Sequence, residues 1–501
     1  MTSSEVAPTA PRREKHRDRF VIPRLAPHEP ADLLASTLRG IRDDLNLTET
    51  FPPEVEAEAS KSVENVRLPA ADQSDIAFVT IDPAGATDLD QAVHLERSGD
   101  GYRVRYAIAD VPSFVPADGA IDAEARRRGQ TIYAPDGRIP LHPTAISEHA
   151  ASLLEGQLRG AFVWTFELDA AANVASTELQ RARVRSREQL SYATVQKQLD
   201  DGTAAPSLTL LKEVGIKREA LEQARGGASL NRPDEEVEFV DGRYTLVRRT
   251  ALPVEGWNAQ ISLMTGMAAA TIMIEGRIGI LRTMPEPWPE TLERFRTQVA
   301  ALGCPWPTTQ NYGEYLRTLD HTDPRSLAVI HAATSLFRGA GYTAFDGEVP
   351  AGLVQAAVGA PYAHTTAPLR RLVDRFVLVT CEALTAGVPV PQWVRDALPA
   401  LPAIMGSSDG VASRLGRASV DAIEAALLAP RVGEVFDAVV ISAKAAVDGR
   451  GASGSIQLTD PAVTATVEGV VAPGSTVQVT LVTADIATGT VLFSVTGSGT
   501  P

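Results

Sequence analysis

The chain has 501 residues, which is too long for one simple hydrophobic core, so we expect two or three domains. Its residues are 44% hydrophobic and 22% charged, as in soluble globular proteins, and the absence of a signal-peptide pattern or of about 18 consecutive apolar residues argues against secretion and membrane insertion. The net charge of −15 repels nucleic acid at long range, so any nucleic-acid site must be a local basic channel.

The first 64 residues are predicted to form an arm and two helices. Residues 1–25 are rich in Pro, Ser and Thr and then basic, so we expect a disordered arm. A solvated tail is favoured over a contact with a phosphate backbone. Apolar residues at helical spacing predict one helix over 27–45 and a second after Pro53, within an N-terminal helical segment at 26–64.

Three carboxylates then gather on one short loop. An apolar, β-prone run over 76–81 ends at Asp82, small residues follow, and Asp88 and Asp90 complete the set before an extended pattern resumes. Like charges this close repel unless a cation neutralises them, and oxygen ligands suit Mg²⁺ or Mn²⁺. A solvated acidic turn is the alternative, and the spacing alone does not decide between the two.

Strands and turns follow the acidic loop. The segments 92–96 and 102–111 predict a hairpin joined by Ser98-Gly99-Asp100-Gly101. Asp110, near its end, is either a strand-end residue or a catalytic acid. Further patterns predict a helix at 121–129, a strand–turn–strand over 130–140 and a strand at 164–168.

Arginine occupies every second position from 181 to 187. On a strand, this period places all four guanidinium groups on one face. A solvated face usually mixes charge signs, so the stripe predicts a phosphate-lined wall.

The central part of the chain is mainly helical. A small-residue helix at 261–274 is expected to lie in the core, and a strand–turn–strand is predicted at 236–249. Other helical patterns occur at 192–200, 208–225, 289–302 and 325–336.

The stretch 362–375 is the second unusual one. A threonine cap and an early proline predict a helix start that places His364 and Arg370 at the helix N-terminus, where backbone amides favour an anion. Arg370 and Arg371 oppose the helix dipole there, which indicates an anionic partner. That partner is either a phosphate or a carboxylate, such as Asp374 paired with Arg370.

Beyond Pro430 the pattern is all-β. Five short strands at 435–441, 454–458, 463–467, 476–482 and 490–495 predict a small OB-type barrel over 431–497. Phe436 and Phe493 are its only aromatic residues, and acidic residues outnumber basic ones. Such a barrel lacks the stacking surface and basic groove of single-strand binders, so we expect it to be mainly structural.

Several short motifs occur in a fixed order along the chain. Thr80-Ile81-Asp82 is followed after five residues by Asp88-Leu89-Asp90-Gln91-Ala92. Next come Ile108-Ala109-Asp110-Val111, Arg128-Gly129, Tyr133 before Ile139-Pro140, Leu190-Ser191-Tyr192 and Thr366-Ala367-Pro368-Leu369-Arg370-Arg371. This order resembles the ribonuclease II (RNB) exoribonuclease family. The resemblance covers about 65–430 and implies an α+β fold, with an RNB catalytic domain of mixed β-sheet flanked by helices before the barrel.

The resemblance also implies a function. Members of this family are Mg²⁺-dependent 3′-to-5′ exoribonucleases that hydrolyse single-stranded RNA to nucleoside 5′-monophosphates, and Mn²⁺ is an alternative ion here. The implied roles are metal binding by Asp82, Asp88, Asp90 and Gln91, cleavage by Asp90 and Arg370, base stacking by Tyr133 and Phe239, and RNA contacts by Arg128, His364 and Arg371. We further expect a monomer without a membrane or an obligatory protein partner. The only cysteines, Cys304 and Cys381, are too few for a disulfide framework, which fits the cytoplasm.

The sequence departs from the family pattern at several positions. Gln91 stands where the fourth acid is usual, so we expect weaker metal binding, and Leu263 and Met264 replace the usual paired glutamates. Residues 1–65 show no counterpart of the cold-shock barrels of larger members. Gln91 and the lost glutamates support the alternative of a catalytically impaired RNA-binding protein that retains the channel. The intact Asp82, Asp88, Asp90 and Arg370 argue against it, so the active exoribonuclease is the leading interpretation. An Asp-x-Asp phosphatase is less consistent, because Asp82 is followed by Pro83 and Ala84.

Overall fold

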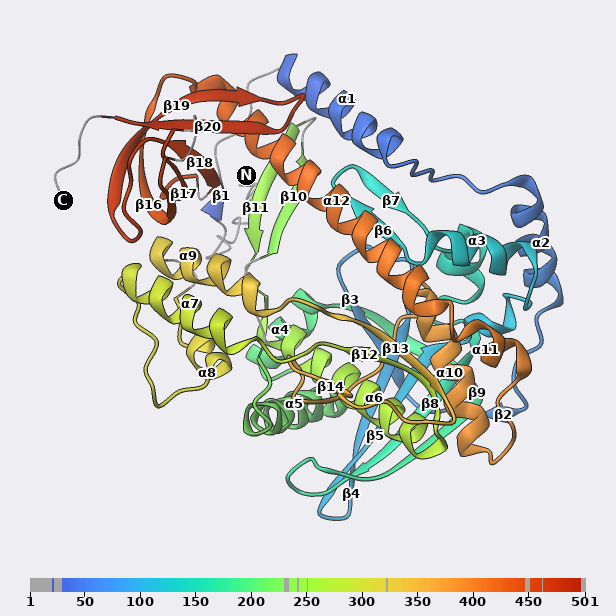
Figure 1. The fold of residues 1–501 in the computed structure, drawn as a ribbon. Helices are drawn as coiled ribbons and strands as arrows, with labels where there is room; N and C mark the ends of the chain where they lie inside the picture. Colours follow the sequence, from blue (N-terminus) through green and yellow to red (C-terminus); the bar gives the residue numbers. More distant parts are fainter. Residues whose placement is uncertain are drawn as a thin grey trace, which may run out of the picture.

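The structure is a computed structural model that describes residues 20–21, 29–228, 234–240, 243–249, 251–320, 323–446, 451–461 and 463–496. Figure 1 shows a curled sheet surrounded by helices at one end and a small barrel at the other. The long helix α12 (Leu401–Leu428) runs between the two parts. This arrangement confirms the predicted α+β fold with a C-terminal barrel.

Both predicted N-terminal helices are present. Helix α1 (Glu29–Asp44) packs against α12, and helix α2 (Pro53–Asn65) starts directly at Pro53. The predicted arm lies outside the described residues except for Phe20–Val21. These two residues form strand β1, which pairs with β11 (Arg243–Arg249), so the prediction of disorder is wrong for them.

The large sheet has the strand order β2-β9-β3-β4-β5-β8, and β9 also pairs with β8, so the sheet curls back on itself. The hairpin of β4 and β5 confirms the turn predicted at Ser98–Gly101. Strands β3 and β4 are antiparallel neighbours inside the sheet, so the end of β3 lies beside the start of β4, where the strands terminate. The strands are β2 (Ala71–Asp72), β3 (Phe78–Asp82), β4 (Gln91–Ser98), β5 (Gly101–Ala109), β8 (Leu158–Leu168) and β9 (Val174–Ser191).

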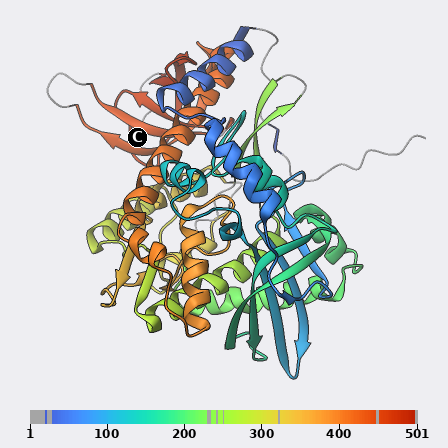
Figure 2. The same cartoon turned by 90° about the vertical axis from the view of Figure 1, so that its right-hand side faces the viewer.

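Apolar side chains cover both faces of this sheet. One face packs against the central helices, including the small-residue helix that was expected in the core, and the other packs against α2 and α3. Figure 2 shows α2 crossing near the sheet in a view from the side. These helices are α3 (Ala120–Arg128), α4 (Tyr192–Asp200), α5 (Pro206–Ala224), α6 (Pro253–Gly276), α10 (Leu372–Thr385) and α11 (Gln392–Ala397).

Smaller elements connect these layers. An insertion of helices α7 (Pro289–Ala301), α8 (Tyr312–Arg317) and α9 (Pro324–Ala333) lies between strands β12 (Ile278–Thr283) and β13 (Gly341–Asp346) and packs on the barrel. Short hairpins are formed by β6 (Ile132–Ala134) with β7 (Gly137–Ile139), by β10 (Asp234–Val240) with β11, and by β14 (Val354–Gln355) with β15 (Ala360–Pro361). No helix in the described part of the chain is long and apolar enough to cross a lipid bilayer.

The C-terminal barrel is closed and has the strand order β16-β17-β18-β20-β19. Its strands match the five predicted segments: β16 (Val435–Lys444), β17 (Ser453–Leu458), β18 (Thr464–Glu468), β19 (Thr476–Asp485) and β20 (Thr490–Val495). Phe436 and Phe493 point into the barrel core, where their ring centroids lie 5.5 Å apart. Neither ring is therefore exposed for base stacking, in line with a mainly structural barrel.

The arginine stripe lies on β9 as predicted, but it is not a free cationic wall. Arg181 pairs with the buried Asp110 through Nη2 (2.6 Å), and Arg183 pairs with Asp72 (2.9 Å). Arg187 donates to the Ser74 carbonyl (2.7 Å). The predicted phosphate-lined wall is wrong for Arg181 and Arg183, because carboxylates within the fold already match their charges. The same contacts give Asp110 a structural role. For the exposed Arg187 the wall stays a prediction.

Candidate active site

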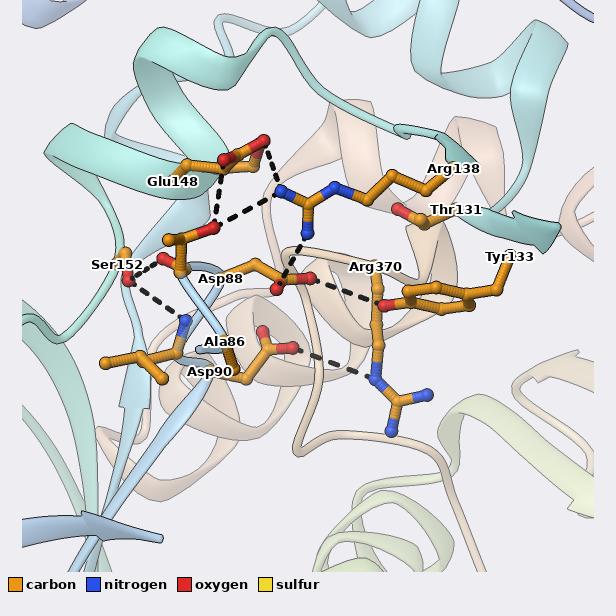
Figure 3. Close-up of polar contacts among 12 residues, drawn as sticks. Ala86, Asp88, Asp90, Thr131, Tyr133, Arg138, Glu148, Ser152 and Arg370 are labelled. Atoms are coloured by element: carbon orange, nitrogen blue, oxygen red, sulfur yellow. Dashed lines mark hydrogen bonds and ion pairs between the residues drawn. The ribbon is translucent and has the colours of Figure 1, made fainter. Parts of the chain in front are cut away.

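The acidic loop lies at the sheet edge where β3 ends and β4 begins (Figure 3). Gly85 has φ +84°, a left-handed conformation that glycine adopts without strain. Ser152 holds the loop from outside, because its hydroxyl donates to the Thr87 carbonyl (2.7 Å) and accepts from the Leu89 N–H (2.9 Å). These contacts between Ser152 and the loop backbone fix the position of the loop from which the carboxylates extend.

One of these carboxylates is buried, and a second has one buried oxygen. Asp90 is 3% exposed, accepts the Leu369 N–H at Oδ1 (2.8 Å), and has a pKa raised well above its usual range because burial disfavours the charge. In Asp82, Oδ2 is buried without a hydrogen-bond partner. Burial, and then the charge of Asp88, raise the pKa of Asp82 to about 7. Carboxylates in this state are the groups that a bound cation stabilises.

Asp88 is turned toward the β6–β7 hairpin (Figure 3). Arg138 donates through Nη1 to Asp88 Oδ1 (3.0 Å), and the Tyr133 hydroxyl donates to Oδ2 (3.3 Å). Tyr133 is 54% exposed, so its ring is open to a stacking partner while its hydroxyl binds the acidic loop. Its predicted stacking role stays a prediction and is consistent with this position.

The predicted helix start near residue 366 is wrong. Helix α10 begins at Leu372 with Arg371 at the N-cap, and the preceding residues form a loop. Tertiary contacts hold this loop: Asp90 accepts the Leu369 N–H, and the Thr131 N–H donates to the Arg370 carbonyl (2.9 Å). Arg370 extends from the loop with its side chain 44% exposed, and its Nε lies 3.9 Å from Asp90 Oδ2.

Two neighbours of Arg370 are engaged within the fold. Arg371 donates to Asp374 through Nε (3.0 Å) and Nη2 (2.8 Å), so the carboxylate predicted to pair with Arg370 pairs with Arg371 instead. His364 shares a hydrogen bond with the Tyr342 hydroxyl (2.8 Å), and burial lowers its pKa well below its usual range, which keeps it neutral. Asp374 matches the charge of Arg371, so the RNA contact predicted for Arg371 does not fit this position. The contact predicted for His364, which is partly exposed, stays a prediction.

Arg128 is also a structural residue. Its side chain is 4% exposed and pairs with Glu124 (2.7 Å). Its remaining nitrogens donate to the carbonyls of Thr48, Thr50 and Pro140 at 2.7–3.1 Å. A guanidinium that is buried and satisfied in this way is not available to RNA, so the predicted contact does not fit the structure.

Two further positions singled out in the sequence lie in β10 and α6. Phe239 is in β10, opposite Tyr244, but its side chain lies outside the described part of the structure, so its stacking role stays a prediction. Met264 is 1% exposed in α6 and belongs to the core.

Gln91 joins β4 to the loop that carries Arg370. Its Nε2 donates to the Thr366 carbonyl. Because a carbonyl can only accept, the amide nitrogen must face Thr366, and a carboxylate could not make this contact. The structure thus gives Gln91 a tethering role through its amide nitrogen. This contact does not use the amide oxygen Oε1, so the predicted role of Gln91 as a metal ligand stays a prediction.

This tether predicts the effect of Gln91→Glu, which removes the donor and keeps the side-chain length. We expect the free energy of unfolding to fall by about 1–3 kcal/mol, because the largely buried Thr366 carbonyl then faces a carboxylate oxygen. Denaturant unfolding in a chelator measures the change, with Gln157→Glu on the exposed surface as the control. Equal stability of the two variants would contradict the tether.

A divalent cation fits the donor set after one adjustment. Among the described residues, no three His, Cys, Asp or Glu side chains lie close enough together to hold a metal ion, since Asp88 is turned toward Arg138 and Tyr133. The unpartnered oxygen of Asp82 and the buried carboxylate of Asp90 are nevertheless hard oxygen ligands of the kind Mg²⁺ prefers. The chemistry of these donors therefore suits a divalent cation, and Asp88 would add a third oxygen ligand only after it turns from Arg138 and Tyr133.

Arg138, Glu148 and Ser152 also contact the acidic loop or its partners, and none of them was predicted from the sequence. Arg138 follows Tyr133 in the same predicted strand–turn–strand, so the hairpin pattern held a signal for it. Ser152 lies 63 residues from its partner Leu89, and no local pattern marks such a contact.

Comparisons with protein families identify the two parts of the chain. The RNB domain profile matches residues 71–386, which include the acidic loop, Tyr133 and Arg370. The chain belongs to the RNB family. The profile of the RNase II-type exonuclease C-terminal S1 domain matches residues 434–496 of this RNB protein, which form the closed barrel. Both matches confirm the predicted family.

Curated relatives resemble part of this RNB protein. Ribonuclease R of Escherichia coli is 28% identical over 331 residues, which are 62% of this chain and 40% of that protein. Exosome complex exonuclease RRP44 homolog A of Arabidopsis thaliana is 28% identical over 343 residues, or 64% of this chain and 36% of that protein. The match thus spans well under half of the length of each relative.

Solved structures share the fold over most of the chain. RNase R of Mycoplasma genitalium, solved in complex with ribose methylated single-stranded RNA, has a TM-score of 0.81 at 17% identity and covers 93% of this chain and 78% of that one. Yeast Ssd1, described as a pseudonuclease, has a TM-score of 0.68 at 17% identity and covers 88% of this chain and 56% of that one. At these identities the likeness shows the fold alone.

Proposed function

We propose that this RNB protein is a Mg²⁺-dependent 3′-to-5′ exoribonuclease that hydrolyses single-stranded RNA to nucleoside 5′-monophosphates. The observation that carries the proposal is the pair of acids Asp82 and Asp90, the first with an unpartnered buried oxygen, beside the half-exposed guanidinium of Arg370. Relatives named ribonuclease R and exonuclease support the reaction class. From the sequence we retain the expectation of a cytoplasmic monomer.

The acids would hold the cation, and Arg370 would act on the phosphate. When bound by Asp82, Asp88 and Asp90, Mg²⁺ (or Mn²⁺) supplies the charge that polarises a phosphoryl oxygen and lowers the pKa of an attacking water. The exposed guanidinium of Arg370 offers a planar pair of donors to the phosphate oxygens as negative charge develops on them. Asp90 also keeps the Arg370 loop in place through the Leu369 N–H.

Tyr133 would position the RNA end. Its exposed ring provides a flat surface for a terminal base, which binds with little sequence preference. Its hydroxyl contact with Asp88 places that surface next to the acidic loop. A duplex does not present an unpaired terminal base in this way, which agrees with a single-stranded substrate.

The test uses the purified full chain with 5′-labelled and 3′-labelled single-stranded RNA, in Mg²⁺, Mn²⁺ or a chelator. We expect the 5′-labelled RNA to shorten progressively and the 3′ label to leave at once as a nucleoside 5′-monophosphate, in metal only. The absence of metal-dependent shortening would refute the proposal.

The alternative is a catalytically impaired RNA-binding protein that retains the channel. The amide of Gln91, bound to the Thr366 carbonyl where the family has an acid, is the observation that favours it. In the same experiment, RNA that is bound in a mobility-shift assay and stays intact in both metals would select this alternative.

A further inference from the structure

Arg138 is at the centre of an ion-pair network beside the acidic loop (Figure 3). Its Nη1 lies 3.0 Å from Asp88 Oδ1, and its Nη2 lies 2.5 Å from Glu148 Oε1 in the π-helical turn Ala145–Ala150. Nη2 also donates to the Thr87 hydroxyl (3.2 Å), which itself donates to Glu148 Oε2 (2.9 Å). One guanidinium therefore bridges the acidic loop and a neighbouring carboxylate.

The network occupies Asp88 and leaves Asp82 without a partner. Both oxygens of Asp88 have a donor, Arg138 at Oδ1 and Tyr133 at Oδ2, whereas Asp82 Oδ2 has none. A fixed positive charge 3.0 Å from a ligand oxygen repels a cation that approaches the same carboxylate. A divalent ion must therefore take Asp88 from Arg138.

We propose that Arg138 is an internal counter-cation that competes with the divalent metal for Asp88, and that Glu148 receives Arg138 when the metal binds. This inference rests on the proposed function, because it assumes a metal held by the acidic loop. Arg138 is a positioning residue here, since it acts through Asp88.

The surroundings of Arg138 allow it to leave Asp88 and to remain paired with Glu148. The side chains of Arg138, Asp88 and Glu148 are 31%, 16% and 18% exposed, so their interactions are less screened than those of surface pairs. Arg138 keeps Glu148 and the Thr87 hydroxyl after it leaves Asp88, so the guanidinium does not become unpaired. Glu148 thus lowers the free-energy cost of releasing Asp88.

Two substitutions with opposite expected effects test the competition. Mn²⁺ is titrated into the full chain without RNA, and free Mn²⁺ is followed by electron paramagnetic resonance. Arg138→Gln is expected to bind Mn²⁺ at least about fivefold more tightly, because the competing charge is gone. Glu148→Gln is expected to bind it more weakly, because Arg138 then pairs with Asp88 alone. If the network only supported the structure of the loop, both variants would weaken binding.

Arg97→Gln is the matched control. Arg97 pairs with Glu213 (2.6 Å) near the far end of β4, about 20 Å from Gln91 along the strand, and should leave Mn²⁺ affinity unchanged. Thermal unfolding verifies that each variant is folded. If Arg138→Gln does not fold, the Mn²⁺ affinity of Glu148→Gln alone tests the proposal.

Asp90→Asn separates failure of the inference from failure of the proposed function. If the wild type binds Mn²⁺ and Asp90→Asn does not, unchanged or weaker binding by Arg138→Gln overturns the competition alone. If wild type and Asp90→Asn bind Mn²⁺ equally, there is no metal site at the acidic loop, and both proposals fall.

Discussion

Asp90→Asn is expected to reduce the rate of RNA shortening on the order of 10³-fold, the largest single effect at this site. The substitution removes a negative charge from the cation site and changes little else in shape. The amide oxygen of asparagine still accepts the Leu369 N–H, so the Arg370 loop stays in place. The loss therefore reports on the charge of the acidic loop.

Stability measured in a chelator completes this prediction. Burial raises the pKa of Asp90, so the ionisable carboxyl costs the fold stability as the pH rises above its ordinary pKa when no cation is bound. Removing the charge should thus leave the unfolding temperature equal or higher. Asp100→Asn, in the exposed turn between β4 and β5, is the control for a lost surface carboxylate. Shortening at the wild-type rate by Asp90→Asn would contradict the assigned site.

Arg370→Gln is expected to lower the single-turnover rate constant of cleavage by about 10²–10³-fold and to change the affinity for RNA much less, because the guanidinium acts on charge that develops during cleavage. Its side chain is 44% exposed and its Nε lies 3.9 Å from Asp90, so the fold depends little on it. The measurement is single-turnover cleavage in Mg²⁺, with RNA binding measured separately in a chelator.

The adjacent Arg371→Gln gives a matched contrast. Arg371 makes a two-point pair with Asp374, which is fully buried, and removing one partner of such a pair costs about 3–5 kcal/mol of stability. We expect a large fall in unfolding temperature for Arg371→Gln and almost none for Arg370→Gln. The reverse pattern would show that the roles of the two arginines are exchanged.

Local patterns were sufficient for much of the fold. Alternation of apolar residues placed the five barrel strands, and the run into Asp82 placed the end of β3. Both features can be predicted from a single segment, because every second side chain of a β-strand faces the same core and the apolar residues follow that period.

Features that depend on distant partners were not predictable in the same way. The Thr-x-Pro pattern before Arg370 is typical of a helix start, yet contacts with Asp90 of the acidic loop and Gln91 of β4 hold it as a loop. Arg181 looked free because Asp110, which neutralises it, lies 71 residues earlier. The acids of the site were found from sequence, but Arg138 and Ser152, which orient them, became visible only in three dimensions.

Helix α12 links the barrel to Tyr133. Its Leu415 packs with Ile132 and Ile139 of the β6–β7 hairpin, and Leu428 near its end packs into the barrel core. Both contacts lie on one continuous helix, and the 13 residues from Leu415 to Leu428 correspond to a rise of about 20 Å that backbone hydrogen bonds hold constant. The helix therefore keeps the barrel and the β6–β7 hairpin at a constant separation. An RNA strand that contacted both would bridge that fixed distance, which a flexible linker would not provide.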